Sequence, residues 1–235
     1  KLDEIKKSTR VYQFIRFNQQ KKVHNKVIEI ENISKSYDKI SVINKFSTII
    51  SSGDRIAIIG ENGIGKTTFL KCLVEDEFIN EGKVKWSENA LVGYFPQNPS
   101  NEFKSNISLM DWMNQWSHDE DDLETVRGTL GRLLFSQNDI GKPINVLSGG
   151  EQRRMLFGKI ILQRANVIIL DEPTNHLDME SIESLNHALN LFEGTSIFVS
   201  HDREFISSLA NRVIEIKPGK IIDYDDNYNN YISKK

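Results

Sequence analysis

The stretch GENGIGKT, Gly60–Thr67, combines glycines, a lysine and a hydroxyl residue at the spacing G-x-x-x-x-G-K-[ST]. Glycine permits a backbone that wraps closely around a phosphate, and the amides of such a loop and of the following helix point at the anion. Lys66 is placed to reach the β- and γ-phosphates, and the Thr67 hydroxyl to bind Mg²⁺. Since the stretch follows the apolar segment RIAII and opens a helical pattern, it predicts a nucleoside triphosphate site.

Two adjacent carboxylates, Asp171 and Glu172, end the apolar segment VIIL. Side chains at the carboxyl end of a parallel strand enter the ligand crevice of an open α/β sheet. We expect Asp171 to hold Mg²⁺, usually through water, and Glu172 to polarise an attacking water molecule. Two acids after a strand are a weak signal alone, but together with a phosphate loop they predict triphosphate hydrolysis.

A second anion-binding pattern, NVLSGGEQRR, places Ser148, Gly149 and Gly150 at the start of a further predicted helix. The first turn of a helix points unpaired N–H groups at an anion. One nucleotide needs only one such cradle, so these residues require a different role from the phosphate loop.

The composition is that of an ordinary globular protein, with 38% hydrophobic and 27% charged residues and a net charge of −3 over 235 residues. No apolar run approaches the roughly 18 residues that span a bilayer, and no leader has the order of a signal peptide. The single cysteine, Cys72, excludes a disulfide within the chain, and we expect a buried thiol and a reducing, cytoplasmic compartment. Because the first residue is Lys1, we expect a piece of a longer chain.

Charge is spread unevenly. Residues 1–26 hold eight Lys or Arg and two Asp or Glu, a net charge of +6, which leaves −9 for the rest. A basic arm on an acidic body indicates contact with a polyanion, although a solvated helix end explains the charge equally well.

The elements that must position these residues alternate between strands and helices, which predicts an α/β fold with helices on the faces of a largely parallel sheet. β-branched stretches before the phosphate loop predict an antiparallel β part, and residues 82–95, GKVKWSENALVGYF, are expected to form a hairpin-like pair of strands. From about residue 98 to 160 the apolar spacing becomes helical, which predicts a helical subdomain inserted into a mixed-sheet core.

Six motifs occur in the order typical of ATP-binding cassette (ABC) ATPases: the phosphate loop, Gln97 after GYFP, LSGGEQ, ILDEP, TNHLD and SHD. The resemblance covers residues 27–225 and implies the P-loop nucleotide-binding fold of that family, with ATP and Mg²⁺ as ligands. It implies that Gln97 links the metal site to the helical subdomain, that His201 contacts the γ-phosphate and that Tyr37 stacks on adenine. For Tyr37 a packed strand-end tyrosine, and for His201 a strand-end cap, are the alternatives. The implied nucleotide contacts are Tyr37, Gly60, Glu61, Asn62, Gly63, Gly65, Lys66, Thr67 and Thr68; the implied metal ligands are Thr67, Gln97 and Asp171; and the implied catalytic residues are Glu172, His201 and Gln97.

The family also gives the second anion-binding pattern a role. In ABC ATPases two cassettes pair head to tail, so the resemblance implies that Ser148, Gly149, Gly150 and Glu151 close over a nucleotide held by another cassette.

The string DEPTNHLD, together with KWSENALVGYF and DMESIESLNHAL, resembles the second, C-terminal cassette of the YbiT-type branch of the ABC-F subfamily. The ABC-F proteins carry two cassettes on one chain and act on the ribosome. The resemblance makes residues 1–26 the end of a helical, basic linker between cassettes and residues 226–235 a tail in which Asp226 replaces a usual glycine. The implied partners are a second cassette and, through the linker, rRNA and tRNA.

Two other functions compete. One is the ATPase subunit of an ABC membrane transporter, because such subunits use the same motifs. Copurification with a membrane protein would distinguish this function. A non-catalytic interaction module is disfavoured by the presence of Lys66, Asp171 and Glu172. We expect no direct contact with a membrane.

Overall fold

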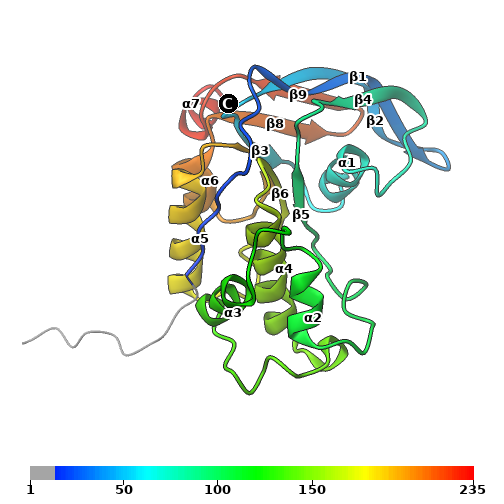
Figure 1. The fold of residues 1–235 in the computed structure, drawn as a ribbon. Coiled ribbons are helices and arrows are strands. Elements are labelled where there is room, and N and C mark those ends of the chain that lie inside the picture. The colour runs from blue at the N-terminus through cyan, green and yellow to red at the C-terminus, as the bar shows by residue number, and fades with distance from the viewer. Residues whose placement is uncertain (1–13) are drawn as a thin grey trace, which may run out of the picture.

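A six-stranded sheet and a three-stranded sheet form the framework of the computed structural model, which describes residues 14–235 (Figure 1). The strands are β1 (Lys26–Tyr37), β2 (Ile40–Ser51), β3 (Arg55–Ile59), β4 (Glu81–Trp86), β5 (Val92–Phe95), β6 (Val167–Asp171), β7 (Thr195–Val199), β8 (Arg212–Lys217) and β9 (Lys220–Tyr224). The helices are α1 (Lys66–Leu73), α2 (Leu109–Asn114), α3 (Leu123–Arg132), the short 3₁₀ helix η1 (Ile144–Val146), α4 (Gly149–Gln163), α5 (Met179–Leu191), α6 (Arg203–Leu209) and α7 (Tyr228–Ser233). Within residues 14–235 no helix is both long and apolar enough to cross a membrane.

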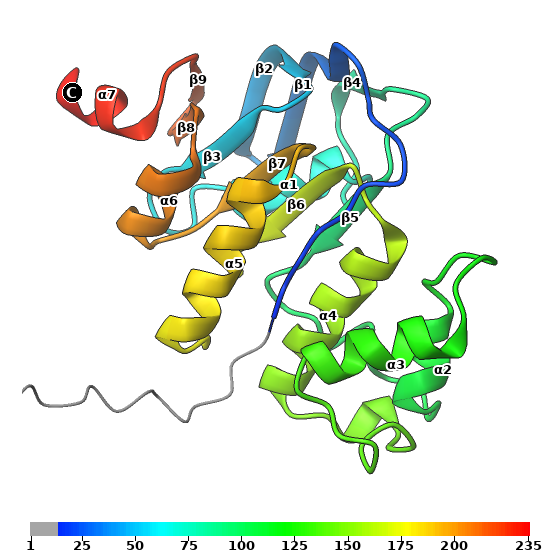
Figure 2. The same ribbon diagram turned by 60° about the vertical axis from the view of Figure 1, so that its left-hand side comes forward.

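The six-stranded sheet runs in the order β5-β6-β7-β3-β8-β9, with only β9 antiparallel to its neighbour. Every residue of β6 and β7 is buried, which explains the apolar runs VIIL in β6 and IFV in β7. Along β6, Val167 and Ile169 pack on the side of α1, whereas Ile168 and Leu170 pack on the side of α4, α5 and α6. The expected α/β fold with helices on both faces of a mixed sheet is therefore confirmed (Figure 2).

Helix α1 lies between the two sheets. Phe69 of α1 meets Phe46 of β2 edge to face, with ring centroids 5.7 Å apart, and Leu70 and Leu73 are completely buried. The antiparallel sheet, in the order β2-β1-β4, thus covers the helix that follows the phosphate loop. This packing fixes α1 from two sides.

The hairpin expected over residues 82–95 is wrong. Strand β4 pairs with β1 in the three-stranded sheet, whereas β5 runs parallel to β6 in the other sheet. The backbone turns between them, where the Trp86 indole N–H donates to the Leu73 carbonyl (2.9 Å). Strand β5 joins the parallel sheet because it packs directly on α4: a Cβ on Gly93 would lie 3.0 Å from a methyl group of Ile160.

Helices α2 and α3 and the first part of α4 form a layer beside the six-stranded sheet, around a core that includes Trp112, Met113, Val126 and Leu130. Ser108 and Asp122 cap α2 and α3 with side-chain hydrogen bonds to backbone amides. A Cβ on Gly158 of α4 would lie 2.5 Å from the Met113 terminal carbon, so α4 and α2 pack closely at this point.

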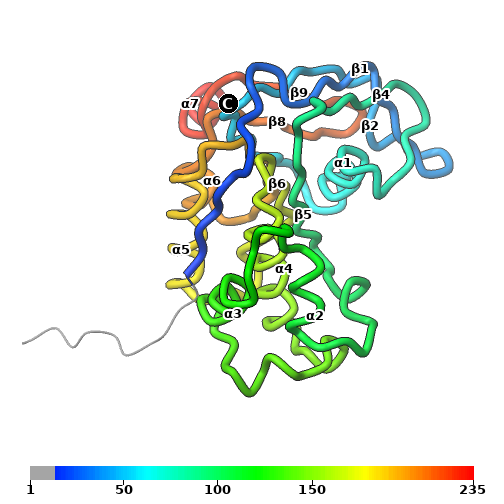
Figure 3. The backbone as a smooth tube through the Cα atoms, in the orientation of Figure 1, coloured from blue at the N-terminus to red at the C-terminus, as the bar shows by residue number. Residues whose placement is uncertain are grey.

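The helix expected within residues 1–26 is absent from the described part, residues 14–25, and residues 1–13 lie outside the described structure. Residues 14–25 run as an irregular strap along α5 (Figure 3). The Phe14 amide donates to the carbonyl of Arg132 (2.9 Å) and the Gln20 amide to that of Arg164 (3.0 Å). Because Phe17 packs edge to face on Phe192, the strap is held by tertiary contacts in place of helical hydrogen bonds.

The segment 226–235, expected as a tail, contains helix α7, which begins at an Asn227 cap. Tyr231 is buried, and its ring meets that of Tyr224 at 5.0 Å. The Lys235 ammonium bonds to Glu215 (2.7 Å), so the end of the described chain is docked on β8.

The Cys72 thiol on α1 is 2% exposed, and burial raises its pKa to about 11. At pH 8 only about one such thiol in a thousand is ionised, and the thiolate is the reactive form.

We predict that a thiol reagent labels the folded protein far more slowly than the protein in denaturant, as followed by absorbance or mass spectrometry. Cys72→Ala is the control and should not label at all; equal labelling rates in both conditions would contradict the buried position.

Candidate active site

The loop between β3 and α1 has a backbone shape that glycine adopts most readily. Gly60, Gly63 and Gly65 have φ angles of 150°, 76° and 113°. A Cβ on Gly65 would lie 2.1 Å from a methyl carbon of Val42, so the position has no room for a side chain. Gly65 caps α1 without a side-chain hydrogen bond, which leaves the first amides of the helix available to a ligand.

Lys66 folds back over this loop. Its side chain is nearly buried, and its ammonium donates hydrogen bonds to the carbonyls of Gly60 and Glu61, both at 2.9 Å. Burial lowers the Lys66 pKa, and the charges of Glu172 and Asp171 oppose that effect. The ammonium therefore lies within electrostatic reach of both acids.

Asp171 and Glu172 are almost completely buried at the end of β6. Neither carboxylate oxygen of Asp171 meets a partner within residues 14–235 in good hydrogen-bond geometry; burial raises its pKa, and the neighbouring Thr67 hydroxyl opposes that rise. Burial also raises the pKa of Glu172, while the nearby His201 opposes this. The His201 Nε2 lies 3.0 Å from a Glu172 carboxylate oxygen.

The Glu172 backbone has a φ of 53°, in the left-handed region that a glutamate rarely adopts. Its amide donates to the Val199 carbonyl of the neighbouring strand β7 (3.0 Å). A non-glycine residue held in this region stores strain, and such residues concentrate at functional sites.

The predicted residues of the phosphate loop and of the acidic strand end meet in one pocket of about 390 Å³. Its lining comes from the glycine loop, the start of α1, the segment after β5 and the ends of β6 and β7: Asn62, Gly63, Gly65, Lys66, Thr67, Thr68, Gln97, Asp171, Glu172, Val199 and His201. Gly60 and Glu61 do not line it and contact Lys66 through their carbonyls.

The donor set fits a hard divalent cation. Asp171 contributes two buried oxygens without hydrogen bonds, and Thr67 and Gln97 line the same pocket with a hydroxyl and an amide oxygen. Mg²⁺ prefers oxygen ligands and usually combines one or two carboxylates with substrate phosphates and waters. Within residues 14–235 no group of three or more His, Cys, Asp or Glu is placed to hold a metal ion.

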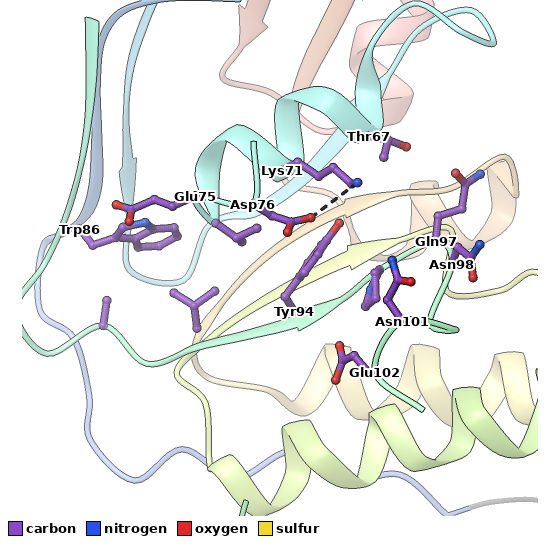
Figure 4. A pocket seen from close by; sticks show the side chains of 14 residues that line it. Thr67, Lys71, Glu75, Asp76, Trp86, Tyr94, Gln97, Asn98, Asn101 and Glu102 are labelled. Carbon is purple, nitrogen blue, oxygen red and sulfur yellow. Dashed lines mark ion pairs between the residues drawn. The ribbon is translucent and has the colours of Figure 1, made fainter. Parts of the chain in front are cut away.

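A larger pocket of about 810 Å³ adjoins the first and shares Thr67 and Gln97 with it (Figure 4). It extends between α1 and β5 to Trp86, and Figure 4 shows the Tyr94 ring projecting from β5 toward the Lys71–Asp76 ion pair. It has no assigned ligand.

Tyr37, expected at the adenine, does not line the smaller pocket. It ends β1 and is 42% exposed. The Lys35 ammonium lies 4.6 Å from its ring centroid and is itself held by Glu77 (2.7 Å) and the Phe78 carbonyl (2.8 Å). The Tyr37 ring therefore packs against Lys35 and remains partly exposed to solvent.

The turn that starts α4 also lies outside the pocket. Ser148, Gly149 and Gly150 are exposed, and a Cβ on either glycine would meet nothing within 4 Å. Ser148 and Glu151 form a capping box, in which the Ser148 amide donates to the Glu151 carboxylate (2.8 Å) and the Ser148 hydroxyl accepts from the Glu151 amide (3.4 Å). The conformation of this turn is therefore fixed by its own hydrogen bonds, and the turn is exposed on the surface of its own chain.

Arg153 belongs to none of the predicted site residues, yet it lies beside them in the structure. It lies on α4, is buried, and donates to the carbonyls of Gln97 (3.1 Å) and Glu172 (3.4 Å). Its signal in the sequence is weak, because a charged residue near the start of a predicted helix is usually exposed.

Comparisons with known proteins agree with this geometry. A model of the family described as ABC transporter matches residues 43–175. The protein called "Probable ATP-binding protein YbiT" of Escherichia coli O157:H7 is 52% identical over 235 residues, which are 100% of this chain and 44% of that protein. "ABC transporter F family member 5" of Arabidopsis thaliana is 37% identical over 223 residues, 94% of this chain and 32% of that protein. The chain thus spans less than half the length of these relatives.

The fold is also that of solved ABC structures. A bacterial Atm1-family ABC exporter with ATP bound aligns with a TM-score of 0.75 at 16% identity, over 93% of this chain and 42% of that chain. The family match covers more than half of this chain and includes the phosphate loop, Asp171 and Glu172. The chain therefore belongs to the ABC transporter family as an ATP-binding cassette ATPase domain, with F-family proteins among its relatives.

Proposed function

We propose that this cassette hydrolyses ATP with the residues that meet in the smaller pocket. The observation that carries the proposal is the convergence of the phosphate loop with Gln97, Asp171, Glu172 and His201 around one space. The loop and the amides of α1 bind the phosphates, and Lys66 leaves its loop carbonyls to neutralise the β- and γ-oxygens. Thr67, Gln97 and Asp171 would hold Mg²⁺, which would supply positive charge against the charge that develops on the phosphates.

Glu172 is the residue that polarises the attacking water. Its carboxylate lines the pocket, and within the described chain the polar neighbour of its oxygens is His201, whose Nε2 lies 3.0 Å from one of them. Burial makes this carboxylate more basic than an exposed one, which favours acceptance of a proton from water. His201, which is more than half exposed, turns from Glu172 toward the γ-phosphate.

Tyr37 is proposed as the stacking surface for adenine. Its exposed ring offers a contact worth about 1–3 kcal/mol per base. Lys35 and Glu77 fix the ring from beneath, which reduces the ordering cost on binding.

A second cassette completes each site. The exposed Ser148–Gly150 turn has a cap and open backbone amides but no ligand position in its own pocket, which supports a role at the nucleotide of a partner cassette. A γ-phosphate gripped from both sides draws two surfaces together, and its loss releases them. The chain alone is therefore expected to bind ATP weakly and to hydrolyse it slowly.

The setting that we propose is a cytoplasmic two-cassette protein of the ABC-F type that acts on the ribosome. The support is the string TNHLD, the F-family relatives, and relatives more than twice as long as this chain. The basic residues of 1–26 suit contact with rRNA or tRNA phosphates.

We predict that Glu172→Gln in the full-length protein lowers kcat for ATP hydrolysis by about 100-fold or more, because the amide cannot accept the proton of water. ATP affinity, measured by calorimetry, should stay within about threefold because no phosphate ligand is lost. Glu124→Gln, an exposed change on α3, is the matched control and should leave both quantities unchanged. Normal turnover in Glu172→Gln would remove this residue from the mechanism.

We predict that Gly150→Asp abolishes hydrolysis by the paired cassettes without harming the fold. The new side chain enters open space and sits in the first turn of α4, where a negative charge is stabilising by about 0.3–1 kcal/mol. The same charge repels a γ-phosphate presented by a partner cassette. Gly128→Asp on exposed α3 is the control, and ATPase activity with thermal unfolding are the measurements. A fully active Gly150→Asp protein would rule out the proposed pairing.

We predict that full-length Glu172→Gln protein sediments with ribosomes when ATP is present and not when it is absent, because trapped ATP keeps the cassettes closed. Added Lys66→Ala should reduce this sedimentation, since the loop then lacks its cation for the phosphates. Failure to pellet, together with copurification of a membrane protein, would favour the transporter subunit instead.

A further inference from the structure

Arg153 joins three parts of the molecule that are distant in sequence. It lies on α4, one turn beyond the capping box of Ser148, and its side chain is buried among the segments that carry Gln97 and Glu172. Its guanidinium also lies over the Phe95 ring of β5, 5.7 Å from the centroid.

The hydrogen bonds of this guanidinium go to main-chain carbonyls. One nitrogen donates to the Gln97 carbonyl at 3.1 Å and another to the Glu172 carbonyl at 3.4 Å. The planar fork of arginine suits two acceptors held side by side, which a lysine ammonium does not match. No carboxylate oxygen within residues 14–235 lies at ion-pair distance from Arg153; burial lowers the pKa of its guanidinium, and the charge of Glu172 opposes that effect from farther away.

A purely structural role explains this arrangement poorly. Buried charges are usually paired, and a hydrocarbon side chain of similar volume is often equally stable at such a position. Arg212 shows the usual solution in this same protein: its guanidinium bonds to the carboxylates of Asp54 (2.8 Å) and Asp223 (2.6 Å). The buried guanidinium of Arg153 instead bonds to the two backbone segments that place Gln97 and Glu172 in the pocket.

The strained backbone of Glu172 gives the contact a consequence. With a φ of 53°, Glu172 directs its carbonyl to Arg153 and to the Asn175 amide (3.3 Å), while its amide is held by Val199 (3.0 Å). Without the guanidinium, one restraint on this unfavourable conformation is lost, and the carboxylate can leave the position that the reaction requires.

We propose that Arg153 is a positioning residue, which fixes Gln97 and Glu172 to helix α4 so that the amide and the carboxylate face the phosphates in a defined geometry. The proposal rests on the ATPase function proposed above and adds a residue that does not itself line the smaller pocket. Because α4 begins at the Ser148–Gly150 turn, the same bonds connect that turn rigidly to the catalytic carboxylate of its own chain.

The test compares Arg153→Met, Arg153→Lys and Lys159→Met in the full-length protein. Methionine keeps much of the length of arginine and removes its donors. Lys159 is the matched control, since it is a largely buried cation on the same helix that pairs with Glu102 (2.6 Å) and does not line the smaller pocket. The measurements are kcat and KM for ATP, and hydrogen exchange without nucleotide of peptides that cover residues 92–99 and 168–178, neither of which contains Glu102.

We expect Arg153→Met to lower kcat by at least about tenfold with KM within about threefold, because binding groups remain and orientation is lost. Exchange should rise in both peptides. For Arg153→Lys, kcat and exchange should lie between those of the parent and of Arg153→Met, because one ammonium can bond well to only one of the two carbonyls. Lys159→Met should have the kcat and exchange of the parent.

An Arg153→Met protein with kcat within twofold of the parent and unchanged exchange would overturn the proposal. So would an equal loss in Lys159→Met, since that result indicates general destabilisation of α4. If the parent itself fails to hydrolyse ATP, the proposed function fails, whereas the exchange measurement still tests the positioning role independently.

Discussion

The burial of two adjacent carboxylates at the end of a wholly apolar strand is the constraint on which the rest of the structure depends. The side chains of Asp171 and Glu172 are almost completely buried, and few groups of the protein donate hydrogen bonds to their carboxylate oxygens. Such groups are costly in the absence of a cation or a donor. Lys66, His201 and a divalent ion with its phosphates are the charges that can compensate them, and the pocket holds the space for these at the required place.

The two sheets serve this constraint by fixing helix α1. The parallel sheet positions the acids and His201 at the ends of β6 and β7, and the antiparallel sheet holds α1 against it from the other side. Val42 of that second sheet lies so close to Gly65 that this position of the loop has no room for a Cβ. The antiparallel sheet is therefore part of the phosphate site, although its only candidate ligand is Tyr37.

The sequence allowed the chemistry to be predicted more readily than the pairing of strands. The phosphate loop and the Asp171–Glu172 pair are local patterns whose geometry follows from glycine and from the end of an apolar strand, and the structure brings them together. The hairpin of residues 82–95 failed because a strand chooses its partner by distant packing, here that of Gly93 on Ile160. The contacts of Arg153 could not be predicted, because its acceptors are backbone carbonyls. Every residue has such a carbonyl, so no side-chain pattern in the sequence indicates which ones are bonded. Within residues 14–25 the expected helix does not form, and Phe17 packs instead on Phe192 at the end of α5.

The strap of residues 14–25 has a mechanical consequence. Its bonds to the carbonyls of Arg132 and Arg164, and the ion pair of Lys22 with Glu193, attach it in turn to the ends of α3, α4 and α5 before the chain enters β1. A force applied at residue 14 would therefore act on the ends of these three helices before it reached the antiparallel sheet. One of them, α4, begins at the Ser148–Gly150 turn, so the strap connects the entrance of the described chain to the helix that carries that turn.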